Sequence, residues 1–161
     1  DEKFQARNSR LTAEGTLHVL LSHGLMALDE MSVLVIGFGR TGAAVARILR
    51  QVGVKRLTVA TTASLRPAYA FADNVIPIGS FDFAQYDTVI NTVPQHIIDD
   101  KAVLTFSPSA LYIDLATKPA LNLCFAKYLG IDAEIYPALP AKTAPLSAAR
   151  AIKDYVLEVT K

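Results

Sequence analysis

Three glycines, Gly37, Gly39 and Gly42, directly follow the apolar run 32–36, which is typical of a buried strand. The first glycine suits a sharp turn, the second lets a pyrophosphate approach the backbone, and the third lets the next helix pack closely. The unpaired N–H groups at the start of that helix favour an anion. A turn without a ligand would not need all three glycines at this spacing. We therefore expect a dinucleotide to bind the whole turn, Gly37, Phe38, Gly39, Arg40, Thr41 and Gly42.

The segment after the expected second strand bears on the choice between NAD and NADP. An NAD site carries an acidic residue there for the ribose 2′-hydroxyl, and this chain has none. It has instead hydroxyls and one guanidinium that could hold a 2′-phosphate, at Thr61, Thr62, Ser64 and Arg66. NADP is therefore favoured and NAD stays possible. The alternative is that Thr62 or Ser64 caps a helix and Arg66 is solvated.

Two later strand ends also carry candidate cofactor-binding residues. The turn after the fourth expected strand can pass beside a nicotinamide ribose, or it can simply end the strand; it comprises Asn91, Thr92, Val93 and Pro94. The fifth expected strand holds a carboxylate, Asp114, in an apolar run, and a buried carboxylate needs a partner. Asp114 either accepts hydrogen bonds from loop N–H groups or faces the cleft with Thr117 and Lys118. Both alternatives stay open here.

Other groups that could perform chemistry are isolated in the sequence. Of the three histidines, His18, His23 and His96, only His96 lies near the expected cleft. The single cysteine, Cys124, excludes an internal disulfide, and its apolar neighbours predict a place in a helix core. We find no metal-ligand spacing, serine elbow or pair of carboxylates. The catalytic residues are therefore unknown, and the nicotinamide would carry out the hydride transfer.

The elements around these residues alternate between strands and helices. Strands are predicted at 32–36, 57–60, 74–77, 88–91, 111–115 and 133–136. Helices are predicted at 13–25, 43–51, 67–72, 99–105, 121–129 and 145–159. Residues 1–10 are expected to fray, with Thr12 as the cap of the first helix. The loop 136–141, stiffened by prolines, could close over the nicotinamide.

This alternation predicts an α/β fold with a doubly wound parallel sheet, a Rossmann-type NAD(P)-binding domain preceded by a linking helix. We expect residues 1–30 to form the N-terminal segment and linking helix, and residues 31–161 to form the dinucleotide-binding domain. A length of 161 residues suits one such core.

Composition and net charge limit the classes of binding partner that we expect. Hydrophobic residues make up 52% and charged residues 19%, which suits a sheet covered on both faces, or a surface lost to a partner in a homo-oligomer. The net charge of +1 gives no electrostatic reason to expect nucleic acid or an anionic membrane. The sequence has no run long enough to span a bilayer and no secretory leader, so we expect a cytoplasmic location.

Together, these motifs resemble those of a family, the A subunit of dipicolinate synthase, in its C-terminal NADP-binding domain. The similarity runs through 11–15, 33–42, 91–94, 113–116 and the Leu-Pro pair at 139–140, and ends in the closing helix. The resemblance implies an oxidoreductase that converts dihydrodipicolinate to dipicolinate, the pyridine dicarboxylate made during sporulation. It also implies that the partner is a second, flavoprotein-like subunit.

The chain departs from the family pattern in three loops. The family favours two glycines and an acid after Pro119, where this chain has Ala120, Leu121, Asn122 and Leu123. Ala138 and Ala141 replace glycines, and 62–64 replaces an Arg-Ser-Ser run. The family also carries a substrate domain ahead of the linking helix, so the isolated chain is expected to be inactive. The alternatives are the nucleotide domain of a 2-hydroxy-acid or shikimate-type dehydrogenase, and a nucleotide-sensing module without turnover.

Overall fold

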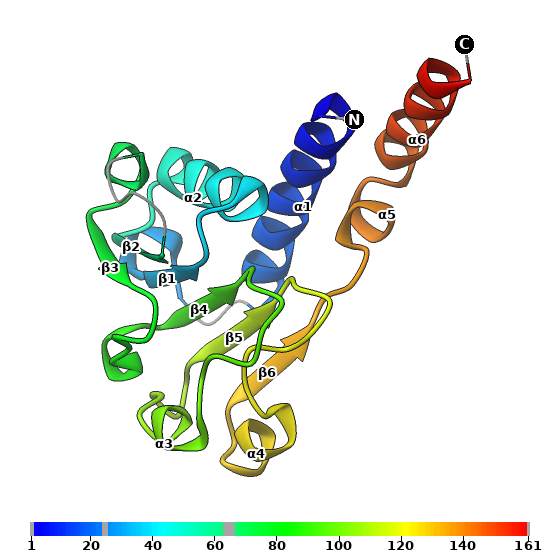
Figure 1. The fold of residues 1–161 in the computed structure, drawn as a ribbon. Helices are drawn as coiled ribbons and strands as arrows, with labels where there is room; N and C mark the ends of the chain where they lie inside the picture. Colours follow the sequence, from blue (N-terminus) through cyan, green and yellow to red (C-terminus); the bar gives the residue numbers. More distant parts are fainter. Residues whose placement is uncertain (1, 24–25, 63–66, 161) are drawn as a thin grey trace.

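The chain forms one all-parallel sheet of six strands with helices on both faces (Figure 1), in a computed structural model that describes residues 2–23, 26–62 and 67–160. The strands are β1 Ser32–Ile36, β2 Arg56–Thr61, β3 Asn74–Pro77, β4 Thr88–Asn91, β5 Leu111–Asp114 and β6 Asp132–Ile135. Their order across the sheet is β3-β2-β1-β4-β5-β6. The predicted doubly wound α/β sheet is thereby confirmed, and its strand order reverses between β1 and β4.

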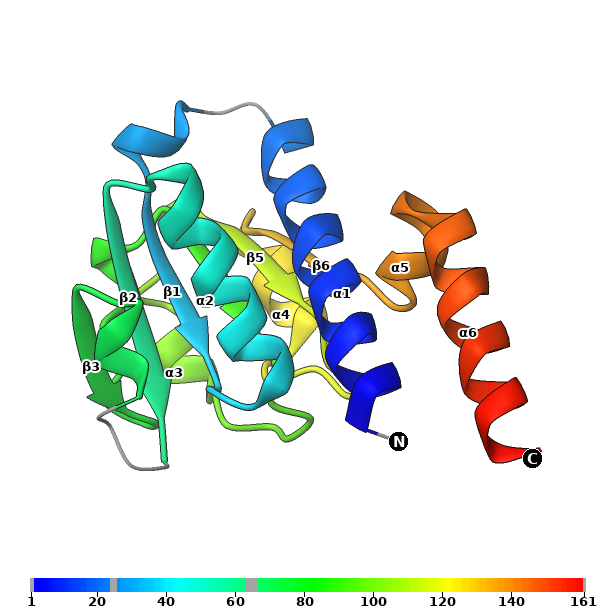
Figure 2. The same cartoon turned by 90° about the horizontal axis from the view of Figure 1, so that it is seen from above.

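The helices cover the sheet in two layers. They are α1 Glu2–His23, α2 Arg40–Val52, α3 Asp100–Val103, α4 Leu123–Tyr128, α5 Leu139–Thr143 and α6 Pro145–Val159, with short 3-10 turns at Leu28–Glu30, Ala68–Ala70 and Phe83–Gln85. Helices α1 and α2 lie over one face, and α3 and α4 lie over the other (Figure 2). In the described part of the chain, no helix is both long and apolar enough to cross a membrane.

Strand β1 shows why the central strands are continuously apolar. Val33 and Val35 pack in the cluster beneath α1 and α2, whereas Leu34 and Ile36 pack in the cluster on the opposite face. All four side chains are fully buried. Successive side chains of a strand alternate between faces, so a strand covered on both sides must be apolar at every position.

Helix α1 is longer than expected, because residues 2–10 are helical rather than frayed. Its first turns lie beside α6, where Lys3 Nζ is 3.4 Å from Glu158 Oε1 and the Phe4 ring stacks on Tyr155 at 5.2 Å between centroids. Thr12 does not cap the helix; its hydroxyl donates to the Asn8 carbonyl from within it, at 2.8 Å. Contacts with the other end of the chain therefore order a segment that is polar in sequence.

Three further expectations need correction. Cys124 is exposed and not in a helix core, because α4 buries Ala126, and residues two apart on a helix face opposite sides. The expected helix at 67–72 is only a 3-10 turn, Ala68–Ala70. Part of the expected loop 136–141 is helix α5, which begins after Ala138 in the left-handed conformation, with φ of 56°.

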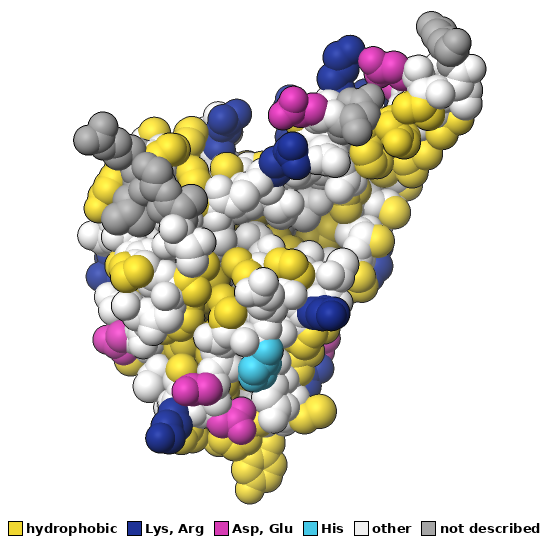
Figure 3. Space-filling model, in the orientation of Figure 1, with side chains coloured by type: hydrophobic (Ala, Val, Ile, Leu, Met, Phe, Trp, Pro, Cys, Tyr) yellow, Lys and Arg dark blue, Asp and Glu magenta, His cyan; other side chains and the backbone are white. Residues whose placement is uncertain are grey.

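Helix α6 extends away from the sheet beside α1 (Figures 1 and 2). It packs against α1 and α5 through Ala148 and Ala151. Hydrophobic side chains are visible over this helix (Figure 3). The exposed large hydrophobic residues of α6 are Leu146, Ile152, Val156, Leu157 and Val159. This surface suits a contact with another protein surface, because exposed apolar patches commonly mark such contacts.

Candidate functional site

The turn between β1 and α2 is shaped by two glycines that the fold itself requires. Gly37 has a φ of +95°, and a Cβ on it would overlap the hydroxyl oxygen of Thr92. Gly42 lies in the first turn of α2, where a Cβ would overlap the carbonyl oxygen of Gly37. Both residues must therefore be glycine for the helix to start this close to the strand.

Gly39 is different, because nothing in the described protein demands a glycine there. Its φ is −75°, which any residue adopts, and a Cβ on it would have no heavy atom within 4 Å. Gly39 is also the N-cap of α2 and provides no side chain to cap the helix. The N–H groups of Arg40, Thr41 and Gly42 have no partner within the helix, since its first bond runs from Ala43 N to Gly39 O. This open, uncapped helix start fits a pyrophosphate, which would use the space left by the missing side chain.

The turn forms one wall of a cavity of about 530 Å³ at the carboxyl ends of β1, β2 and β4. The structure thus brings together most of the residues predicted from sequence, namely those of the turn with Thr61, Thr62, Thr92, Val93 and Pro94. Ile78, Gln95 and Ile97 also line the cavity and were not predicted. The position of Gln95 and Ile97 depends on how the loop after β4 folds back, which no local pattern reveals.

The end of β2 presents hydroxyls and no carboxylate to this cavity. Thr61 is buried and Thr62 is exposed, and both line it. Among the described lining residues, the charged side chain is Arg40, whose guanidinium lies 3.8 Å from Glu2 Oε1. Pro67 and not Thr62 is the N-cap of the 3-10 turn that follows. The predicted Ser64 and Arg66 lie outside the described residues.

Two predicted residues, Asn91 and Asp114, lie behind the cavity wall instead of in it. Both are fully buried. Asn91 Nδ2 donates to both carboxylate oxygens of Asp114, at 3.0 and 3.1 Å, and the backbone N–H groups of Ala116 and Ala120 donate to the same carboxylate at 2.9 and 3.0 Å. The structure thus shows the loop-bonded alternative for Asp114. Thr117 and Lys118, which the other alternative placed beside it, are exposed.

Tyr112 is a partner of Asp114 that the sequence motifs did not predict. Its hydroxyl donates to Asp114 Oδ2 through a short hydrogen bond. Burial, and then the charge of Asp114, raise the pKa of the Tyr112 hydroxyl above its ordinary value, so this group stays a proton donor at neutral pH. A signal was present in the sequence, because residues two apart on a strand share a face.

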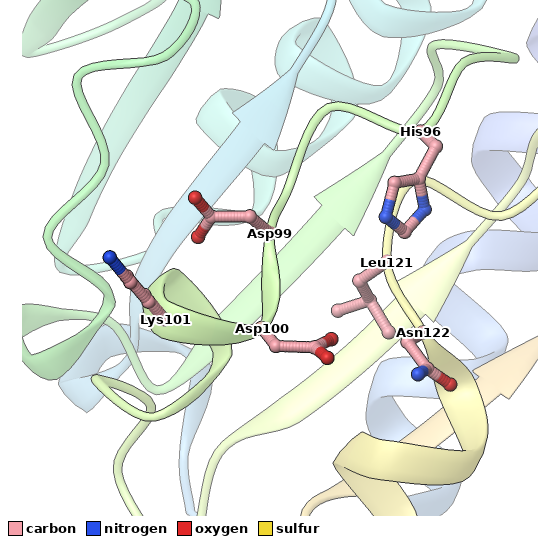
Figure 4. A pocket seen from close by; sticks show the side chains of 6 residues that line it. All are labelled: His96, Asp99, Asp100, Lys101, Leu121 and Asn122. Carbon is pink, nitrogen blue, oxygen red and sulfur yellow. The ribbon is translucent and has the colours of Figure 1, made fainter.

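His96 lies in the loop after β4 and does not line the 530 Å³ cavity. It lines a separate open pocket of about 590 Å³ with Asp99, Asp100, Lys101, Leu121 and Asn122 (Figure 4). Asp99 and Asn122 are already used there as helix caps, accepting from the N–H groups of Ala102 and Phe125. No cluster of three His, Cys, Asp or Glu side chains in the described residues could hold a metal ion. The surroundings of His96 therefore supply no catalytic group to the cavity.

Comparison with known proteins identifies a relative. No family model matches the chain. The A subunit of dipicolinate synthase from Bacillus subtilis (strain 168) is 30% identical over 146 residues, which cover 88% of this chain and 49% of that protein. This chain is a relative of the dipicolinate synthase A subunit. The resemblance predicted from the motifs is thereby confirmed.

Crystal structures of dipicolinate synthase A chains share nearly the whole fold. The Bacillus subtilis chain has a TM-score of 0.93 at 25% identity, and the match covers 99% of this chain and 55% of that one. For the chain from Bacillus halodurans, the TM-score is 0.92 at 27% identity, covering 99% and 56%. The chain therefore spans about half the length of the dipicolinate synthase subunits that it matches.

The fold itself is shared more widely. Shikimate 5-dehydrogenase from Thermus thermophilus, solved with NADP(H) and shikimate, has a TM-score of 0.61 at 24% identity, with coverage of 91% of this chain and 55% of that one. The fold of this chain thus also occurs in a dehydrogenase.

Proposed function

We propose that this chain is the dinucleotide-binding half of a dipicolinate-synthase-like oxidoreductase, with NADP as the favoured cofactor. The observation that carries the proposal is the open position of Gly39 at the uncapped start of α2, facing the 530 Å³ cavity. A glycine that the fold does not require is explained by a ligand that approaches the backbone there. The relationship to the A subunit of dipicolinate synthase supports the same conclusion.

The parts of the dinucleotide are assigned by the chemistry of the surrounding groups. The N–H groups of residues 40–42 would hold the pyrophosphate, because the helix start combines free donors with a positive dipole end. Thr61 and Thr62, with Ser64 and Arg66, would hold the adenosine ribose. The turn 92–94 would border the nicotinamide ribose. When bound, the nicotinamide supplies a centre that accepts or donates a hydride.

NADP is favoured over NAD because no carboxylate lines the described part of the cavity. A carboxylate would accept hydrogen bonds from a ribose 2′-hydroxyl and repel a 2′-phosphate. Hydroxyls and the guanidinium of Arg40 do not repel a phosphate and can donate to it.

The proposed reaction is the oxidation of dihydrodipicolinate to dipicolinate, for which bound NADP would supply the hydride acceptor and a base would take up the proton. The remaining half of the enzyme would bind the substrate, so we expect this chain alone to bind the cofactor without turnover. The proposed partners are a second copy of this chain and a second, flavoprotein-like subunit; the exposed apolar side chains of α6 support a protein contact of this kind. The domain division at residues 30 and 31, and the cytoplasmic location, stay predictions.

Titration with NADPH and NADH tests the proposal. We expect both to raise the melting temperature and NADPH to bind more tightly. Gly39→Val should abolish binding with little loss of stability, because the new side chain enters open space. Ser109→Val is the control: it introduces a valine side chain at an exposed position away from the cavity, in the loop before β5 at the amino ends of the strands. The assignment fails if the unchanged chain binds neither dinucleotide, or if Gly39→Val binds NADPH as tightly as Ser109→Val does.

A further inference from the structure

Asp114 collects hydrogen bonds from three separate pieces of chain. Asn91 donates from the end of β4, the Tyr112 hydroxyl donates from β5, and the backbone N–H groups of Ala116 and Ala120 donate from the loop before α4. The carboxylate is fully buried, and all of these donors are protein groups. One buried charge thus ties the loop after β5 to the end of β4.

The hydrogen bonds between Asn91 and Asp114 fix the end of the cavity wall that adjoins β4. The side chain of Asn91 that donates to Asp114 also closes a tight turn, because Asn91 Oδ1 accepts from Val93 N at 3.0 Å and Asn91 Nδ2 donates to Val93 O at 2.9 Å. Val93 lines the cavity. The orientation of Asn91, and with it the turn at Val93, therefore depends on Asp114.

The hydrogen bond between Ala120 and Asp114 fixes the other end of the same wall, at Ile97. Ala120 donates its N–H to Asp114 Oδ2, and its carbonyl accepts from Ile97 N and Ile98 N at 3.0 and 2.9 Å. Ile97 lines the cavity and Ile98 is fully buried. Residues 93–97, which face the Gly37–Gly42 turn across the cavity, are thus held at both ends through one carboxylate.

We propose that Asp114 is a positioning residue for dinucleotide binding: it touches no cofactor atom, and it holds both ends of the wall 93–97 at the distance from the α2 start that the ligand requires. This inference rests on the proposed function and assigns to Asp114 a part in it that direct contact cannot explain. Loss of the hydrogen bonds to Asp114 should weaken dinucleotide binding even though every residue that lines the cavity is unchanged.

A second carboxylate, partly buried at the amino ends of the strands, separates positioning from general stabilisation. Asp87 Oδ2 accepts a hydrogen bond from the backbone N–H of Ser32 at 2.8 Å, at the start of β1. Asp87 does not line the cavity. Asp114→Asn and Asp87→Asn therefore make the same chemical change to a carboxylate that holds backbone, once behind the proposed site and once away from it.

The experiment measures NADPH affinity and amide hydrogen exchange in both variants. In Asp114→Asn, an amide N–H₂ replaces an acceptor that several donors share, so we expect the dissociation constant for NADPH to rise about tenfold or more. Exchange at Val93, Ile97 and Ile98 should accelerate. Asp87→Asn should bind NADPH within about twofold of the unchanged chain, even where its melting temperature falls equally.

A second variant keeps the test decisive if Asp114→Asn does not fold. Asn91→Ala removes the hydrogen bonds from Asn91 and leaves the one from Ala120 in place, so exchange should accelerate at Val93 but not at Ile97 or Ile98, with weaker NADPH binding. The inference is overturned if the variants behind the site bind like Asp87→Asn, or if all variants weaken together in proportion to stability. If the unchanged chain binds no dinucleotide, the proposed function fails and this inference with it; unchanged binding in Asp114→Asn alone overturns only the positioning role.

Discussion

Gly42 lies against Gly37 so closely that a Cβ on Gly42 would overlap the Gly37 carbonyl oxygen. Gly39, between them, faces open space. Packing of the turn therefore explains why Gly37 and Gly42 are glycines, whereas Gly39 leaves space for a ligand.

Alanine variants should separate these reasons. Gly42→Ala forces backbone apart in a packed turn, so we expect it to lower the free energy of unfolding by about 2 kcal/mol or more. Gly39→Ala should cost less than about 1 kcal/mol, the scale of an altered N-cap. Urea denaturation measures both. Equal losses in the two variants would contradict the packing assignment.

The strands were predictable because their signal is local. The runs in β1, β3 and β4 are short, apolar and rich in β-branched residues, and their predicted bounds match the structure. The start of α1 could not be predicted in this way. Its ordering depends on contacts such as Arg7 Nη1 with Asp154 Oδ2 at 3.3 Å, between residues far apart in sequence.

The residues of the candidate site also differ in whether the local sequence predicts them. The β1–α2 turn was predictable because a strand, three glycines and a helix follow one another in sequence. The role of Asp114 was only half predictable: its strand neighbour Tyr112 shares its face, but the N–H of Ala120 reaches it only because the loop after β5 folds back. Loop closure depends on the whole fold, so a single sequence leaves such donors unassigned.

Ala138 offers a test of backbone strain. It is the described non-glycine residue with a positive φ, at 56°, immediately before α5. The left-handed conformation costs a residue with a Cβ about 1 to 2 kcal/mol, and the greater chain entropy of glycine offsets about 0.5 to 1 kcal/mol of the relief. We therefore expect Ala138→Gly to raise the free energy of unfolding by a few tenths of a kcal/mol to about 1 kcal/mol.

Ala141 is the matched control for this substitution. It lies inside α5, where its N–H bonds to the Ala138 carbonyl at 3.0 Å, so Ala141→Gly should destabilise by up to about 1 kcal/mol. Thermal unfolding of the two variants should shift in opposite directions. A loss of stability in both would show that Ala138 is not strained.

The buried Tyr112 hydroxyl predicts how stability changes at alkaline pH. Burial, and then the charge of Asp114, raise its pKa in the folded chain above the value of about 10 in the unfolded chain. Above pH 10 the unfolded chain releases this proton while the folded chain keeps it, so the stability contribution is complete below pH 10 and falls as the pH rises further. The slope for one proton is about 1.4 kcal/mol per pH unit.

Tyr112→Phe should remove this dependence and leave the titration of the other groups unchanged. The free energy of unfolding of the unchanged chain should therefore fall more steeply than that of Tyr112→Phe between pH 10 and 11 (about 1 kcal/mol more, because the unfolded hydroxyl is already half ionised at pH 10). Tyr69→Phe, at a side chain that is 55% exposed, is the control. Parallel curves for the unchanged chain and Tyr112→Phe would mean that the hydroxyl ionises equally easily in both states, and that the short bond to Asp114 does not persist in solution.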